Sequence, residues 1–176
     1  MPTTTVARVR PDDWRDLRDV RLRALADAPS AFGSTLAREV AFPDDVWRER
    51  AAQGRTLLAR QVPDGGAAAG RDRSPGAVVG IATVVPSPDD PTAADLVSVW
   101  VDPAARGGGV AAALLRSADA LAAELGARTL ALWVTATNTP ARTLYERAGF
   151  AATGETKPLP SDPRLVEVRM TRPVRG

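Results

Sequence analysis

A chain of 176 residues, of which 44% are hydrophobic and 25% charged, has the size and composition of one soluble globular domain. Its 23 basic and 21 acidic side chains nearly balance, so the formal net charge of +2 gives no argument for a nucleic-acid partner. The sequence contains no cysteine and no histidine, which excludes disulfides, thiolate nucleophiles, the usual zinc sites and every histidine-based general base. We therefore expect no bound metal.

The sequence also gives no signal for a membrane. Residues 1–14 lack the apolar core of a signal peptide, and no apolar run approaches the roughly 20 residues that cross a bilayer. We expect one cytoplasmic domain over residues 1–176.

The N-terminal part predicts a strand followed by two helices. Polar and apolar residues alternate over 4–10, as in a half-buried strand. A helical pattern then begins near Pro11 and stops at the breakers that follow Asp27. A second helix is expected over 43–53, because a proline and two aspartates stand at its start.

Two strands follow, joined by a long connection. Residues 56–60 and 77–85 are short, mainly apolar segments, and the second is rich in β-branched side chains, which predicts a strand pair. The segment between them is too rich in glycine, proline and alanine to pack. Residues 61–76 therefore predict a mobile hairpin loop.

The C-terminal half alternates strands and helices. A near-continuous apolar strand is expected over 93–101, followed by a helix that runs to about Leu125 and is closed by Gly126. A strand over 129–134 comes next.

The last helix is expected to begin with Thr139 as its N-cap and Pro140 as its first residue, and to end at Gly149. Residues 150–153 and 165–170 predict the closing strands. The whole layout is an α/β domain built around a mixed sheet.

Three consecutive glycines, Gly107 to Gly109, stand directly before the strongest helical pattern. A flexible loop is one explanation, and a phosphate cradle at a helix N-terminus is another. No Lys-Ser/Thr pair follows, which excludes a P-loop. A dinucleotide fingerprint fits the glycine spacing, but its acidic partner, Glu124, falls inside the helix.

A larger pattern surrounds these glycines. The residues VWVDP at 99–103 and RGGGVA at 106–111 resemble the acetyl-coenzyme A signature of the GCN5-related N-acetyltransferases (GNAT). A second motif of that family, NTPARTLYERAGF at 138–150, follows about one helix and one strand later. The segment VRLRALADAPSAFGST at 20–35 is similar to the acceptor-side helices of many bacterial members.

The resemblance implies the GNAT fold: a mixed, mostly antiparallel sheet that splays between two strands and carries helices on both faces. It also implies an enzyme that moves an acetyl group from acetyl-CoA directly to a primary amine of a small molecule, peptide or protein. An idle CoA-binding module and, more distantly, a dinucleotide-dependent oxidoreductase are the alternatives. Acetyl-CoA would be a cosubstrate, and a homodimer is compatible with the family.

The resemblance assigns roles to particular residues. Tyr145 would protonate the departing sulfur, which suits a phenol with a reference pKa near 10. Asp95, six residues before Val101, is a candidate general base, with bulk water as its rival. The cofactor would be bound by Val99, Val101, Arg106, Gly107, Gly108, Gly109, Val110, Ala111, Asn138 and Tyr145.

Two further points concern substrate contacts. Asn138 would hydrogen-bond the pantetheine amides or mark the helix boundary. Aromatic side chains are available to line an acceptor pocket, although packing explains them equally well: Phe32, Phe42, Trp47 and Trp100.

Overall fold

The computed structural model describes residues 2–62 and 76–175 of the chain. The predicted mobile loop lies almost wholly outside the described residues, at 63–75, and Gln61 belongs to the strand that precedes it. A single seven-stranded sheet runs in the order β1-β2-β3-β4-β5-β7-β6. The strands are β1 (Thr3–Arg8), β2 (Thr56–Val62), β3 (Ala77–Pro86), β4 (Ala93–Val101), β5 (Thr129–Thr135), β6 (Ala151–Leu159) and β7 (Asp162–Pro173).

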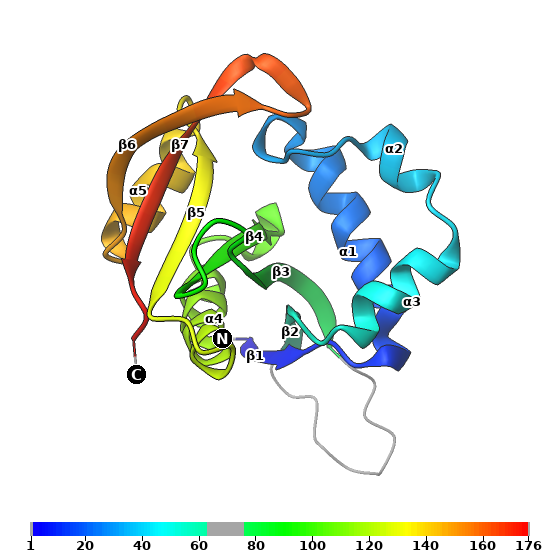
Figure 1. Cartoon of the computed structure of the whole chain (residues 1–176). Helices are drawn as coiled ribbons and strands as arrows, with labels where there is room; N and C mark the ends of the chain where they lie inside the picture. The colour runs from blue at the N-terminus through cyan, green and yellow to red at the C-terminus, as the bar shows by residue number, and fades with distance from the viewer. Residues whose placement is uncertain (1, 63–75, 176) are drawn as a thin grey trace.

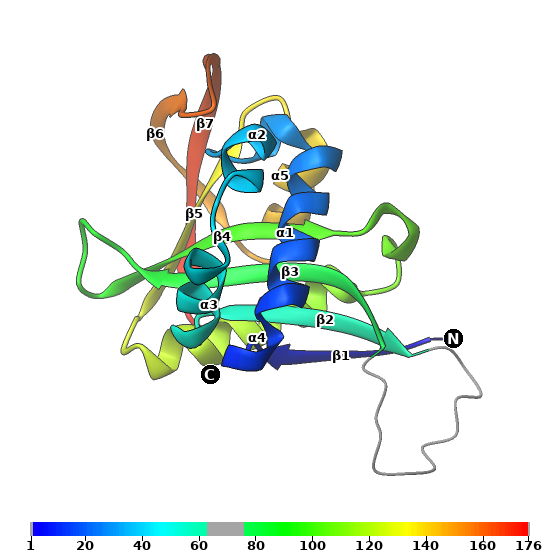
Figure 2. The ribbon, with the colours of Figure 1, turned by 90° about the vertical axis from the view of Figure 1, so that its right-hand side faces the viewer.

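Helices cover both faces of this sheet (Figure 1, Figure 2). On one face, α4 packs across β1 to β4, and Tyr145 of α5 and Phe150, three residues after that helix, belong to the same core cluster. On the other face, α1 packs on β3 and β4 and carries α2 and α3, with Trp47 at the centre of a second cluster. The helices are α1 (Trp14–Asp27), α2 (Leu36–Val40), α3 (Asp44–Ala52), α4 (Val110–Glu124) and α5 (Thr139–Arg147).

The sheet opens between β4 and β5, the one parallel pair among the described strands. Only Ala93, Ala94 and Asp95 of β4 pair with β5, opposite Thr129 to Ala131. Beyond Asp95 the two strands separate, and β5 to β7 run steeply to the direction of β1 to β4 (Figure 2). The predicted splay is confirmed, and it leaves part of the β4 backbone without a strand partner.

Element types agree with the sequence patterns, and several boundaries differ. The last helix has Asn138, not Thr139, as its N-cap, so the predicted start was wrong by one residue. The closing strands are longer than predicted, and the five-residue helix α2 had no sequence signal of its own. Gly126 and Gly149 follow their helices with φ of 77° and 90°, as expected for helix-ending glycines.

None of the described helices combines the length and apolar character that a bilayer crossing requires.

Candidate active site

A cavity of about 540 Å³ lies where β4 separates from β5, between the start of α4 and the start of α5. Its walls come from α1, β4, the glycine loop and α5, which are far apart in the sequence. Of the residues predicted to bind the cofactor, those that line this cavity are Val99, Val101, Arg106, Gly107, Gly109, Val110, Ala111, Asn138 and Tyr145. Gly108 does not line it.

The glycine loop gives the cavity a wall of backbone. Gly107 and Gly109 have φ of 80° and 79°, a region that other residues rarely adopt, and Gly109 is the N-cap of α4. A Cβ atom at either position would meet no atom within 4 Å. The glycines are therefore required by backbone conformation, not by crowding within the protein.

Arg106 is folded back onto the protein. Its Nη2 atom donates to Asp27 Oδ2 at 2.7 Å and its Nε atom donates to the carbonyl of Val101 at 3.1 Å. Trp100 Nε1 donates to the same Asp27 oxygen at 2.9 Å. The Trp100 hydrogen bond, together with Arg106, holds the pKa of Asp27 below its usual range. Sequence reasoning missed Asp27, which lines the cavity as a paired carboxylate at the end of α1.

A β-bulge in β4 shapes the opened edge. Thr83 of β3 pairs with Val97, but Ile81 pairs with Trp100, so β4 carries one extra residue between these pairs. Ser98 lies in the bulge with φ of 58°, the one positive φ at a non-glycine position among the described residues. The bulge redirects the backbone immediately before Val99, at the mouth of the cavity.

Tyr145 and Asn138 form the α5 wall. The Tyr145 ring is buried and packs edge-on to Phe150, with centroids 5.7 Å apart. Burial raises the pKa of the Tyr145 phenol well above its ordinary value, so the phenol keeps its proton at neutral pH. Asn138 Oδ1 accepts a hydrogen bond from the Ala141 amide at 3.3 Å, so Asn138 caps the N-terminus of α5. The side-chain nitrogen Nδ2 of Asn138 remains a donor.

A second cavity, of about 390 Å³, lies on the other side of the splay, between α1, α2 and the β5 to β7 half of the sheet. Ala31 and Phe32, in the loop after α1, line both cavities. That loop is anchored across the opening, because Thr135 Oγ1 donates to the Ser30 carbonyl at 2.7 Å. A hollow of about 60 Å³ lies at the same place and is lined by Tyr145 as well as Trp133.

Two largely buried carboxylates line the second cavity from the strand side. Asp95 and Glu167 both have their pKa raised by burial, which Arg169 opposes at Asp95 and Lys157 opposes at Glu167. The Arg169 Nη2 to Asp95 Oδ1 distance is 3.6 Å, and the Lys157 Nζ to Glu167 Oε2 distance is 3.8 Å. Asp95 was foreseen as a base candidate. Glu167 was not, because it belongs to β7, whose register against β5 no local pattern reveals.

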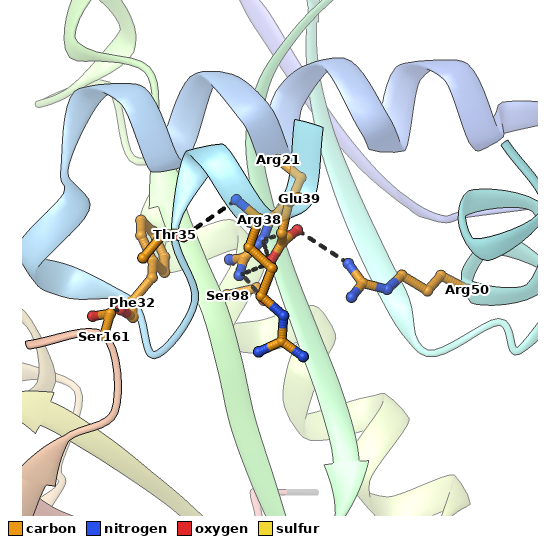
Figure 3. A network of polar contacts seen from close by, with 8 residues as sticks. All are labelled: Arg21, Phe32, Thr35, Arg38, Glu39, Arg50, Ser98 and Ser161. Carbon is orange, nitrogen blue, oxygen red and sulfur yellow. Dashed lines mark hydrogen bonds and ion pairs between the residues drawn. The ribbon is translucent and has the colours of Figure 1, made fainter. Parts of the chain in front are cut away.

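An arginine network lines the same cavity from the helix side (Figure 3). Glu39 of α2 is almost fully buried and pairs with Arg21 at 2.8 Å and Arg50 at 3.2 Å. Burial alone would raise the pKa of Glu39, but its hydrogen bond and charge interaction with Arg21 hold it below the usual value. Glu39 therefore stays ionised and structural. Arg21 Nη1 also reaches Ser98 Oγ in the bulge, at 3.3 Å.

The four aromatic candidates divide between the sites. Phe32 lines both cavities, Phe42 lines the second and Trp100 lines the first. Trp47 is fully buried in the core and contacts neither of these two cavities.

Comparisons with known proteins agree with this geometry. Residues 23–150 match the model of the acetyltransferase (GNAT) family. YwnH of Bacillus subtilis (strain 168), provisionally named a phosphinothricin acetyltransferase, is 41% identical over 58 residues, which are 33% of this chain and 36% of that protein.

Solved structures share the fold over nearly the whole chain. A GNAT acetyltransferase of Streptococcus pneumoniae has a TM-score of 0.73 at 18% identity and covers 98% of this chain and 100% of its own. Salmonella typhimurium yncA, provisionally named an acetyltransferase and solved with its cofactor acetyl-CoA, has a TM-score of 0.70 at 16% identity, covering 99% and 95%. With its splayed sheet, glycine loop and family match, this chain belongs to the acetyltransferase (GNAT) family.

Proposed function

We propose that this protein transfers an acetyl group from acetyl-CoA to a primary amine of a small molecule. One observation carries the proposal: the cavity at the splay gathers the glycine loop, the freed β4 edge and Tyr145 around one space. The second cavity, which meets the first at Ala31 and Phe32, supplies a separate approach for an amine. Its volume of about 390 Å³ fits a small-molecule site.

The residues present fit coenzyme A. A pyrophosphate needs amide donors at a helix start without side chains in the way, and Gly107 and Gly109 leave the space beside them open. Arg106 lines the same cavity, but its guanidinium is held back by Asp27 and the Val101 carbonyl. The pantetheine arm needs a strand edge with unpaired amides and carbonyls, and β4 offers one beyond Asp95. Acetyl-CoA would supply the activated thioester.

The chain's own groups then have distinct tasks. The backbone amide near Val99, redirected by the bulge, would donate to the thioester carbonyl, as an oxyanion donor does. Tyr145, kept protonated by burial, would donate its phenolic proton to the leaving sulfur. Asp95 or Glu167, directly or through one water, would take the proton from the acceptor amine. Their raised pKa values suit a base that works near neutral pH.

The test is a panel of primary amines with acetyl-CoA, in which free thiol release and acetylated product are both measured. Release of thiol in step with product supports the proposal. Tight CoA binding without acetyl transfer to any amine would leave the idle CoA-binding module. Binding of NAD without binding of CoA would favour the dinucleotide alternative instead.

A further inference from the structure

Positive and negative side chains are unevenly distributed around the second cavity. Its helix end carries three guanidinium groups, those of Arg21, Arg38 and Arg50, against the single carboxylate of Glu39. Its strand end carries Asp95 and Glu167 together with basic partners. The helix end therefore keeps an excess of positive charge, of which the exposed Arg38 is the part nearest to solvent-borne ligands.

Arg38 is the cation that the protein leaves available. Among residues 2–62 and 76–175, no carboxylate lies within ion-pairing distance of its guanidinium. Figure 3 shows its side chain extending past the Glu39 carboxylate, which is already bound by Arg21 and Arg50. Its backbone amide is held by Thr35 Oγ1 at 3.3 Å, so the residue is fixed at the start of α2 while its side chain faces the cavity.

Phe42 brings Arg38 and Arg50 together. The Arg38 guanidinium carbon lies 5.9 Å from the Phe42 ring centroid, and that of Arg50 lies 5.0 Å from it. Both cations thus lie beside one aromatic ring. Arg50 donates one hydrogen bond to Glu39, and its other guanidinium donors, like those of Arg38, have no hydrogen-bond partner among the described residues. Two guanidinium groups held in this way present the forked donors that bind a small oxyanion, above all a carboxylate.

The position of the reaction fixes how an acceptor would lie. The amine must approach the splay, where the small hollow is lined by Val97, Ser98 and Tyr145. The rest of the acceptor then extends toward α2 and α3, where the arginines stand. A purely cationic amine would meet repulsion at that end, whereas an amine that carries an anionic group would meet a charge partner at each end.

We propose that the acceptor is an anionic amine of amino-acid size, whose carboxylate binds Arg38 and Arg50 while its amino group faces the splay. This inference rests on the proposed acetyl transfer and names the substrate class of the same site. It also predicts that a peptide N-terminus is a poor acceptor, since its nearest carbonyl is a neutral amide.

The first experiment compares acceptors that share one amine. Amino acids with small, acidic and aromatic side chains are assayed beside their amides and their decarboxylated amines, with saturating acetyl-CoA. Each kcat/KM is expressed per neutral amine, so that differences in amine pKa do not enter. At least one amino acid is expected to exceed both of its neutral counterparts by about tenfold or more, a gain of ~1.4 kcal/mol. Amides or simple amines that react as well as every parent amino acid would overturn the inference.

The second experiment tests the residue. Arg38→Gln is expected to bring the ratio of kcat/KM for the amino acid over its amide close to one, mainly through KM. Arg48→Gln is the matched control, because Arg48 lies on α3, pairs with Asp45 at 3.0 Å and does not line the cavity. An Arg38→Gln protein that keeps the wild-type ratio would refute the assignment.

Failure of the inference is distinguishable from failure of the proposed function. Acetyl transfer that favours the amides or simple amines leaves the acetyltransferase function in place and rejects the anionic acceptor. A panel in which no amine releases thiol rejects both.

Discussion

Replacing Tyr145 by Phe isolates one atom of the proposed mechanism. The ring is buried against Phe150 and Phe keeps its shape, so the core and the CoA cavity should persist. What is lost is a phenolic donor that burial keeps protonated. We expect CoA affinity to remain within about twofold of the wild type, while the rate of acetyl transfer falls about 100-fold, or ~2.7 kcal/mol.

The size of that effect follows from what the variant retains. The amides of the glycine loop, the β4 edge and the acceptor cavity are untouched by the substitution, so orientation and oxyanion stabilisation remain. Only the positioned acid disappears, and such acids typically contribute ~10²- to 10⁴-fold. The raised pKa adds a second expectation. The ratio of wild-type to variant rates should stay constant from about pH 6 to pH 9, because the phenol does not ionise there.

The assay should measure single-turnover acetyl transfer, so that slow product release cannot hide a slower chemical step. Binding of CoA to both proteins is measured by calorimetry on the same samples. Equal rates for the two proteins would remove Tyr145 from the mechanism. A ratio of wild-type to variant rates that falls as the pH rises from 6 to 9 would show instead that the phenol loses its proton in this range, which contradicts the burial argument.

Three further substitutions test other parts of the structure. Gly109→Ala, at φ of 79°, should weaken CoA binding about tenfold in calorimetry, whereas Gly108→Ala, outside the cavity, should not. Equal CoA affinities of the two variants would refute the proposed binding of the pyrophosphate by the glycine loop. Asp95→Asn should lower kcat/KM near neutral pH, with partial recovery at higher pH. Because burial raises the pKa of Asp95, ionisation of this carboxyl destabilises the folded wild type. In thermal melts the variant should therefore gain stability relative to the wild type as the pH rises through the pKa of Asp95. Superimposable pH profiles would exclude Asp95 as the base. Asp119→Ala should lower the free energy of unfolding in urea by about 3–5 kcal/mol, because it leaves the buried guanidinium of Arg172 without the carboxylate that binds it at 2.8 Å. A decrease below ~1 kcal/mol would contradict this.

That the glycine loop and Tyr145 line one cavity was predictable, because the information for each is local. Gly107 and Gly109 lie within three residues of each other and directly before a helix, so their positive φ angles and the helix N-terminus can be inferred together. The second motif likewise places Tyr145 on a short helix with a proline at its start. The start of α5 was predicted one residue too late because Asn138 and Thr139 are both good N-cap residues. Only the structure shows that the Asn138 side chain accepts the hydrogen bond from the Ala141 amide.

The acceptor side was not predictable in the same way. Glu39 lies on a helix of five residues, too short for a periodic pattern, and its partners Arg21 and Arg50 come from two other helices. Glu167 faces the cavity only because β7 pairs with β5 in the observed register, and a shift by one residue would turn it to the other face. Neither arrangement can be predicted from a local sequence pattern.

The bulge in β4 joins these two halves. Ser98 holds a positive φ that costs of order 1 kcal/mol or more for a residue with a side chain, and the next residue, Val99, lines the cavity at the splay. Arg21, which donates to Ser98 Oγ, also pairs with Glu39 on the acceptor side. The orientation of the β4 edge and the charge balance of the acceptor cavity therefore depend on one guanidinium. If Arg38 binds the acceptor as proposed, a substitution there should change acceptor preference and leave the β4 edge intact, whereas a substitution at Arg21 should alter both.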